Sequence, residues 1–412
     1  NLVSSSDSID DWADAVAEQF GRNAGEFGEK DGKFLIFASQ SVSLKPLDPD
    51  YGLALINAFD KALTKVQEEY VMTRFGKVVT DKIKSLYVDS SSNARDIELP
   101  KNNDQDLTGK LIAVFDKSLD VAGKKLDNEL LELGVDPNEI ESQPEKAKKD
   151  LFKEKFLKRT MRDASGSIAG LFVLQTAVIT DKNGRTNVGV IAIASDKTIQ
   201  IAKDISKQRA SLIKGGSKNI EDYIPKNPQE FLHTLGTRLF YDKDGAPAIV
   251  SYGLSSYKED AGDAYLNDQL KATAKDNAVA HADAQIAKLI NGYMNVDNEN
   301  QRGEEINKFV EREIVANSDT IEKTVKNIVN MTNNRTKSSA SARVQGISTI
   351  KNWRFNTDGG QKFVGSVRVW RYSTLKAVNS FNKPKKPAAK KTHKGYEQSF
   401  GTSRRVNSSA DF

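Results

Sequence analysis

The sequence predicts an α+β fold made of two tandem copies of one unit, in which small antiparallel sheets pack on helices. Three observations lead to this prediction. A β-hairpin pattern occurs twice, a strand and a long helical pattern precede each hairpin, and the order strand, long helix, helix, hairpin, short helix is the same in both halves. We therefore place the first unit at residues 1–216, the second at 217–381 and a basic extended tail at 382–412.

The first unit opens with a strand and a long helix. Residues 33–44 (KFLIFASQSVSL) are apolar and then alternate with polar residues, as in a half-buried strand. Apolar residues then recur at helical spacing from about Asp50 to Tyr87. Further helices are expected at about Leu107–Leu133 and Pro144–Met161, where they form an insertion before the hairpin.

The first hairpin is the clearest local signal in the chain. Strand-like residues Ser167–Thr180 and Thr186–Ala194 flank the turn Asp181-Lys182-Asn183-Gly184. Asn-Gly supplies the positive φ angles of a tight turn between antiparallel strands. A helix at about Asp196–Ile213 follows and ends before Gly215-Gly216.

The second half repeats this order of elements. Both returning hairpin strands carry Val-Gly near their start, at Val188-Gly189 and Val364-Gly365, and each unit is expected to hold a three-stranded, mostly antiparallel sheet. The matching segments are two strand-like pieces within Arg238–Tyr257, helices at about Ala261–Met294 and Gly303–Asn330, and hairpin strands Ser338–Ile350 and Lys362–Tyr372. The Ala-rich stretch 271–287 favours a helix that packs closely on a sheet or on another helix.

The positive charge lies almost wholly in the tail. The formal net charge is +5, but the tail holds eight Lys/Arg against Glu397 and Asp411, so the rest of the chain has 53 basic and 54 acidic residues. Low-hydrophobicity Lys/Pro/Ser segments cannot fold alone. We therefore expect a neighbouring subunit to hold the tail. An anionic surface is the alternative partner, and nucleic acid is not expected because the body offers no basic stripe.

The chain has no cysteine, which excludes a thiolate zinc site, a catalytic thiol and a disulfide framework. Absence of thiols favours export to an oxidising compartment, and a first residue other than Met is what removal of a signal peptide would leave. A periplasmic or extracellular location is expected, with the cytoplasm left open. No apolar run is long enough for a membrane helix.

Catalytic patterns are absent from the sequence. Gly215-Gly216-Ser217-Lys218 lacks the upstream glycine of a phosphate-binding loop, and Gly166–Gly170 has its serine one place early for a nucleophile elbow. Asp242-Lys243-Asp244-Gly245 starts like a calcium loop but lacks the later acidic ligands, so a turn is expected there; the oxygen-rich loop 295–300 leaves weak cation binding open. We predict no catalytic residue, no cofactor and no metal.

Three histidines and a group of aromatic residues remain as candidates. His281, near Asp283 on a helix, has the residue types of a general base or metal ligand, but a helix histidine without that role is the favoured interpretation. His233 is isolated in the sequence and His393 lies in the tail. Trp353, Trp370 and Tyr372, with Arg368 and Arg371, have the composition of a nucleic-acid stacking face, although a core or subunit interface is favoured. The residues predicted to form a subunit interface are Trp370 and, in the tail, Lys383, Lys385, Lys386, Lys390, Lys391, Arg404 and Arg405.

The second unit resembles bacterial envelope proteins of the flagellar-lipoprotein FlgP type. The resemblance covers Ala248–Tyr372, with an echo at Phe34–Ala194, and consists of an opening strand, a long Ala-rich helix at Leu270–Ile290 and paired strands with Val-Gly. It implies a ring-forming oligomer in the cell envelope. This chain departs from the family because it is doubled, carries long helical insertions and has no lipidated cysteine.

These observations predict a non-enzymatic bacterial structural protein that assembles with itself into a large homo-oligomer, such as a ring or barrel. The tail would clasp a neighbouring subunit, and open edges of small sheets would pair between copies. Two alternatives stay open. One is a module that binds a polyanion or cell-wall glycan through the tail; the other is an enzyme of unfamiliar type whose pocket gathers His233 or His281 with carboxylates.

Overall fold

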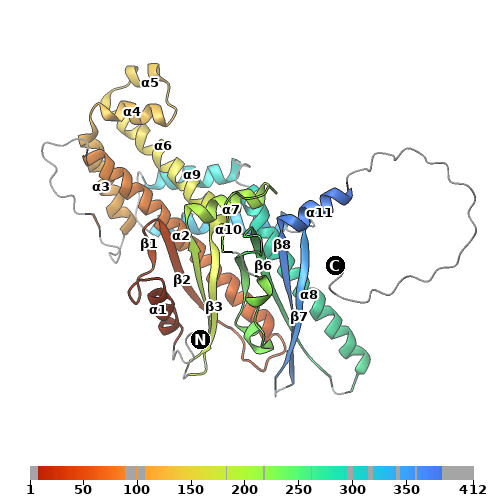
Figure 1. Ribbon diagram of the computed structural model, residues 1–412. Coiled ribbons are helices and arrows are strands. Elements are labelled where there is room, and N and C mark those ends of the chain that lie inside the picture. The colour runs from red at the N-terminus through yellow and green to blue at the C-terminus, as the bar shows by residue number, and fades with distance from the viewer. Residues whose placement is uncertain are drawn as a thin grey trace, which may run out of the picture.

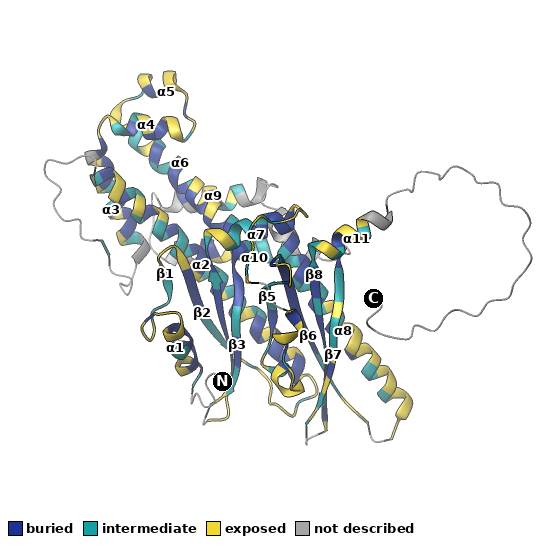
Figure 2. Cartoon of the chain, viewed as in Figure 1, coloured by how far each residue is buried: buried dark blue, intermediate teal, exposed yellow. Residues whose placement is uncertain are grey.

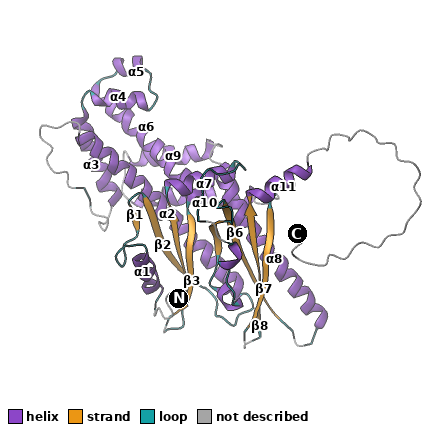
Figure 3. Cartoon of the chain, viewed as in Figure 1, coloured by secondary structure: helices purple, strands orange, loops and turns teal. Residues whose placement is uncertain are grey.

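The computed structural model describes residues 8–88, 99–100, 107–181, 183–216, 219–260, 262–294, 300–313, 319–339, 344–357 and 360–382. Two antiparallel sheets lie side by side, and long helices pack behind them (Figures 1 and 3). The α+β prediction is confirmed. Residues 383–412, which hold nearly all of the predicted tail, lie outside the described residues.

The elements of the first unit run from α1 to α7. They are α1 (Ile9–Gln19), β1 (Gly28–Lys30), β2 (Lys33–Ser41), α2 (Tyr51–Val88), α3 (Leu107–Ala122), α4 (Lys125–Glu132), α5 (Pro137–Ser142), α6 (Glu145–Gly166), the 3-10 helix η1 (Ser167–Gly170), β3 (Phe172–Thr180), β4 (Thr186–Ala194) and α7 (Asp196–Ser206).

The elements of the second unit follow in a similar order. They are η2 (Ile220–Asp222), η3 (Pro228–Leu232), β5 (Gly236–Tyr241), β6 (Pro247–Lys258), α8 (Ala264–Met294), α9 (Asn300–Glu313), α10 (Asp319–Ser339), β7 (Ile347–Asn356), β8 (Gln361–Arg371) and α11 (Tyr372–Asn382).

The two sheets have the same topology, as a duplicated unit requires. Their strand orders are β1-β2-β4-β3 and β5-β6-β8-β7, and every neighbouring pair is antiparallel. The expectation of three strands in each sheet was wrong, because each sheet has a fourth strand that pairs with the strand before the long helix. In the first unit this is the short β1, whose three residues (GEK) carry no apolar pattern.

Both predicted hairpins form, but their first strands start later than expected. β3 pairs with β4 up to Thr180↔Thr186, and β7 pairs with β8 up to Asn356↔Lys362. Residues 167–170 instead form η1, and α10 continues to Ser339 so that β7 begins only at Ile347. In both places a helix extends into residues whose side chains suit a strand equally well.

The helices follow the predicted positions with several interruptions. α2 and α8 match the two long predicted helices, whereas the helix expected at 107–133 is broken at Gly123, where φ is +50°. The helix expected at 303–330 is two helices, α9 and α10. Neither α1 nor α5 was anticipated; α1 is capped by the Ser8 side chain, which accepts a hydrogen bond from the Asp11 amide.

Helix α2 belongs to the cores of both units. Its buried face includes Phe59, Val66 and Tyr70, which join one large cluster with residues of both sheets. At its start, the Gly52 amide donates to Ser256 Oγ on β6 over 3.1 Å. The boundary predicted between the units therefore does not divide the hydrophobic core, since the long helix of the first unit begins against the sheet of the second.

The Ala-rich part of α8 packs closely on β6, as its composition predicted. A side chain at Gly253 would overlap the carbonyl oxygen of Ala278, and it would lie 3.0 Å from the Ala282 methyl group. Small residues on both elements let the two backbones approach each other. Further along the same interface, Ile249, Ile286 and Trp370 form a second cluster with α7.

The paired Val-Gly residues have one structural explanation. A side chain at Gly189 would lie 2.6 Å from the Trp12 ring of α1, and one at Gly365 would overlap the Trp353 ring of β7. Both glycines lie on the sheet face that points away from the long helix of their own unit. In each unit an indole therefore covers the returning strand at the same place.

Candidate functional site

The second sheet has a long open edge at β7. The inner edges of the two sheets adjoin, because Thr176 Oγ1 on β3 donates to the His233 carbonyl over 2.6 Å, just before β5. That leaves β1 and β7 as the outer edges (Figure 1). β1 has three residues, whereas β7 has 10 and pairs only with β8 among the described residues. Long unpaired edges are templates for pairing with another strand.

The register shows which amides of β7 point outward. The Thr357 amide donates to the Gln361 carbonyl, so this pair is a hydrogen-bonded one. Hydrogen-bonded and non-hydrogen-bonded pairs alternate along an antiparallel ladder. Arg354, opposite Val364, and Asn352, opposite Ser366, are therefore in non-hydrogen-bonded pairs. Their N–H and C=O groups face away from β8 and are positioned to bind another strand.

The first turns of α8 project beyond the second sheet on the side of β7. Figure 2 shows this end of the helix exposed around its circumference. Tyr265 is 75% exposed and Leu266 is 38% exposed. The helix start is well formed, since Asp263 Oδ1 accepts the Leu266 amide over 2.9 Å. An ordered helical arm that leaves two large apolar side chains in water is a feature of contact surfaces.

Charges of both signs lie near the open edge and the arm. Tyr257, at the end of β6, has its pKa raised by partial burial and by the charges of Glu259 and Asp268, against the opposing charge of Arg354. Lys362 pairs with Glu259 over 3.5 Å. Basic β7 and the acidic loop before α8 therefore form neighbouring parts of one surface, which we call the β7–α8 surface: β7 residues 347–356 and loop and helix residues 259–273.

A pocket lies between the two units, where α2, α8, α10, η1 and β5 meet. Its volume, which includes space open to solvent, is about 740 Å³. The polar side chains that line it are Asp60 and Gln67 from α2, Ser165 from α6, Thr237 from β5, Gln285 and Lys288 from α8, and Thr332 and Asn333 from α10. Apolar side chains on β3, η1 and their neighbours complete the wall. A junction between units is a common place for a small-molecule site.

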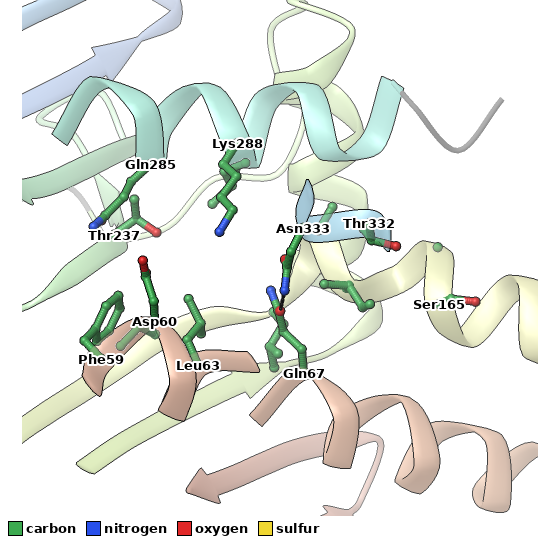
Figure 4. A pocket seen from close by; sticks show the side chains of 16 residues that line it. Phe59, Asp60, Leu63, Gln67, Ser165, Thr237, Gln285, Lys288, Thr332 and Asn333 are labelled. Carbon is green, nitrogen blue, oxygen red and sulfur yellow. Dashed lines mark hydrogen bonds between the residues drawn. The ribbon is translucent and has the colours of Figure 1, made fainter. Parts of the chain in front are cut away.

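The pocket lining holds one acid and one base on opposite walls. Figure 4 shows the Asp60 carboxylate extending from α2 toward Thr237 and Gln285, while the Lys288 side chain extends from α8 into the same space. Asn333 Nδ2 donates to Gln67 Oε1 over 2.8 Å, which ties α10 to α2 at the far end. The site is thus a polar slot with separated charges.

His281 lies behind the pocket on α8. Its ring nitrogen is 2.9 Å from Gln285 Nε2, and burial lowers its pKa despite the nearby Asp60 charge. Asp283, its neighbour in the sequence, instead binds Arg368 of β8 through both carboxylate oxygens. The carboxylate near His281 is therefore Asp60, from a distant part of the chain. This arrangement is the one that would favour the enzyme hypothesis, although His281 does not itself line the pocket.

His233 lines a second hollow between the sheets. That hollow, of about 900 Å³ including space open to solvent, is lined mainly by apolar groups such as Tyr51, Leu55 and Phe363. Burial lowers the pKa of His233, against the charge of Glu230. Among the described residues, no group of three or more His, Cys, Asp or Glu side chains is arranged to hold a metal ion.

The prediction that Trp370 forms part of a subunit interface was wrong. Its side chain is 1% exposed and packs with Ile286 and Ile290 of α8, so it cannot contribute surface to a partner. Trp353 is also buried and stacks on Phe231, with ring centroids 4.9 Å apart. These two aromatics do not form an exposed nucleic-acid platform. The predicted interface residues Lys383, Lys385, Lys386, Lys390, Lys391, Arg404 and Arg405, and His393, lie outside the described residues.

The remaining sequence candidates are structural. Ser167 Oγ is buried and donates to the Ala164 carbonyl over 2.7 Å, so it has the environment of a helix-end hydroxyl. Asp242 Oδ1 accepts the amides of Asp244 and Ala246, both at 2.9 Å, and Gly245 has a φ of +72°. The acidic segment is therefore a turn, as expected. Among the helices that the structure describes, none combines the length and apolarity needed to cross a membrane.

Comparisons with known proteins identify the fold without assigning an activity. Residues 111–207, from α3 to the end of α7, match the family model described as "Domain of unknown function (DUF6844)". A search of curated proteins finds no match. The whole chain is similar in structure to the hypothetical protein FTT1539c from Francisella tularensis, with 21% identity and a TM-score of 0.51, over 90% of this chain and 93% of that one. The likeness covers both units, so the doubled arrangement is shared by that solved structure.

Proposed function

We propose that this chain is a structural subunit that assembles with further copies of itself through the β7–α8 surface. The observation that carries the proposal is the 10-residue edge strand β7, whose outward amides at Asn352 and Arg354 lie beside an exposed helical arm. The sequence favoured self-assembly through the tail, through Trp370 and through open sheet edges, without identifying which edge. The described residues support the β7 edge as the primary contact.

A second copy is the partner whose chemistry fits this surface. Two β7 strands related by a two-fold axis would pair antiparallel, and each would satisfy the open edge of the other. Arg354 on β7 and the acidic residues Asp260 and Asp263 in the loop before α8 are exposed, so they would supply opposite charges to such a contact. Tyr265 and Leu266 on the α8 arm would be covered in the same contact. Because the surface carries charges of both signs, the basic groups of one copy can lie opposite the acidic groups of the other copy.

The tail has a secondary role in this proposal. Eight Lys and Arg residues in 382–412 provide positive charge that would bind an acidic groove on a neighbouring subunit. A location in the periplasm or outside the cell fits the absence of cysteine. A polyanion or cell-wall partner for the same tail is the alternative that the tail's charge favours.

The test is the solution mass of the chain by light scattering at about 50 and 500 mM salt. Arg354→Pro removes an outward amide and leaves the hydrogen bonds to β8 in place, so it should reduce the assembly toward the 45.5 kDa monomer. Arg354→Ala is the matched control, because it removes the same side chain and retains the amide. Asn352→Pro provides a second edge block, and Tyr265→Ser tests the arm without altering the strand.

The outcomes separate the edge from the tail. Dissociation by either proline variant, with assembly retained in Arg354→Ala, supports pairing through β7. Dissociation only on truncation after Phe381 would make the tail the principal contact and would contradict an edge-paired interface. An unaltered chain with a mass of 45.5 kDa at both salt concentrations would refute self-assembly itself. Circular dichroism confirms that each variant retains its secondary structure.

A further inference from the structure

The pocket between the units has features that self-assembly does not use. Seven elements from both halves of the chain contribute to it: α2, α6, η1, β3, β5, α8 and α10. Two half-buried charged side chains, Asp60 and Lys288, line this junction together with apolar groups.

Asp60 is the acidic end of the pocket. Its carboxylate has no hydrogen bond or ion pair with another residue in the part of the chain that the structure describes. The His281 ring of α8 lies near enough to interact with the Asp60 charge, and burial lowers the histidine pKa against that charge. The carboxylate charge is therefore available to a cationic group that enters the pocket.

Lys288 is the basic end. It projects from α8 into the pocket on the side opposite α2, and Gln67 and Asn333 line the floor near it (Figure 4). A lysine ammonium binds carboxylates and other small anions as a compact charge. Because the two charged ends cancel, the pocket as a whole favours a ligand that is neutral overall and carries one charge of each sign.

The apolar part of the wall is mainly aliphatic, with Phe59 of α2 as its aromatic member. Leu63 of α2, Ile168 of η1, Leu171, Val173 of β3 and Leu289 of α8 line it between the charged ends. Branched aliphatic walls favour a branched aliphatic group over an aromatic or a second charged one. Thr237, on the floor next to Asp60, adds a hydroxyl that can accept or donate a hydrogen bond.

We propose that this pocket binds a small zwitterion of the aliphatic α-amino-acid class. The ligand ammonium would bind the Asp60 carboxylate, the ligand carboxylate would bind the Lys288 ammonium, and the aliphatic side chain would contact Leu63, Ile168 and Leu289. Such a site would make the junction between the two units sensitive to a small molecule. The proposal does not depend on self-assembly.

Three probes of one carbon skeleton test it: L-leucine, 3-methylbutylamine, which lacks the carboxylate, and 4-methylpentanoate, which lacks the amine. Titration calorimetry of the full chain at up to about 10 mM probe detects millimolar binding. L-Leucine should bind at least about tenfold more tightly than either probe that lacks one charged group. Absence of leucine binding, or equal binding of all three probes, would overturn the proposal.

Two variants test the charged contacts separately. Asp60→Asn should weaken leucine and the amine by about tenfold or more and leave 4-methylpentanoate unchanged, and Lys288→Gln should have the converse effect. Lys61→Gln on α2 and Lys275→Gln on α8 are matched controls at exposed positions outside the pocket, and both should bind like the unaltered chain. If Asp60→Asn reduced the affinity for 3-methylbutylamine and for 4-methylpentanoate equally, the pocket would be generally damaged and the assigned contacts would be contradicted.

A third variant tests the pocket without changing a charge. Ala169 lines the wall, so Ala169→Leu would fill part of the space and should reduce leucine affinity by about tenfold or more. Leucine binding that survives Ala169→Leu unchanged would place the ligand elsewhere on the chain and would overturn the proposal.

Discussion

The guanidinium of Arg238 and the hydroxyl of Thr176 join the two sheets. Arg238 Nη2 donates to Thr176 Oγ1 over 3.0 Å, and the same oxygen accepts the Leu235 amide over 3.1 Å and donates to the His233 carbonyl. Arg238 has no carboxylate partner among the described residues; it donates instead to the Leu235 and Thr237 carbonyls and lies over the Tyr252 ring. Its full burial lowers its pKa to about 10.

Thr176→Val should destabilise the chain by about 1–3 kcal/mol, because it leaves the buried Leu235 amide and one Arg238 nitrogen without an acceptor. The free energy of unfolding in urea measures this loss. Thr180→Val is the matched control on the same strand. Among the described residues its hydroxyl hydrogen-bonds to Thr186, at the hairpin end, and the loss of stability there should be about 0.5 kcal/mol. Equal losses in the two variants would show that the junction between the sheets does not depend on this hydroxyl.

Gly253→Ala should destabilise the chain by about 3 kcal/mol or more. The added methyl group would overlap the Ala278 carbonyl, so β6 and α8 would have to move apart. Gly303→Ala in α9 is the matched control, because nothing lies within 4 Å of the added methyl group. That change should stabilise the helix by about 0.5–1 kcal/mol. The midpoint of thermal unfolding should fall for Gly253→Ala and rise for Gly303→Ala. An unchanged midpoint for Gly253→Ala would mean that α8 does not approach β6 this closely.

The repeated order of elements was predictable because local signals specify it. Gly184, with a φ of +75°, permits the first hairpin turn, whereas Asn183 does not have the positive φ that was expected; the apolar spacing of residues 51–88 specifies α2. The Val-Gly pairs were also visible in the sequence. Their cause was not, because the indole that covers Gly189 belongs to Trp12, in a helix that the sequence analysis did not anticipate.

The candidate site could not be predicted by the same means. Asp60 and Lys288 lie on separate amphipathic helices, where a charged residue ordinarily faces solvent, and no spacing or motif relates them. Only tertiary packing brings them to one pocket. Trp370 illustrates a related limit: a core and a subunit interface bury an aromatic side chain equally well, so its composition and position did not distinguish them.

His281 should make stability depend on pH below neutrality. Burial lowers its pKa in the folded chain below the ordinary value of 6.5, with Asp60 opposing and Lys288 reinforcing this effect. Between the two pKa values the unfolded chain binds more protons, so stability falls as pH decreases from about 6.5 toward the folded pKa, by at most about 1.4 kcal/mol for each pH unit. Urea unfolding at pH 7, 6 and 5 should show this loss, and His281→Gln should reduce it. Asp60→Asn should increase the loss of stability at low pH, because it removes the negative charge that opposes the lowering of the His281 pKa. The same pH dependence in the unaltered chain, His281→Gln and Asp60→Asn would exclude His281 as its source.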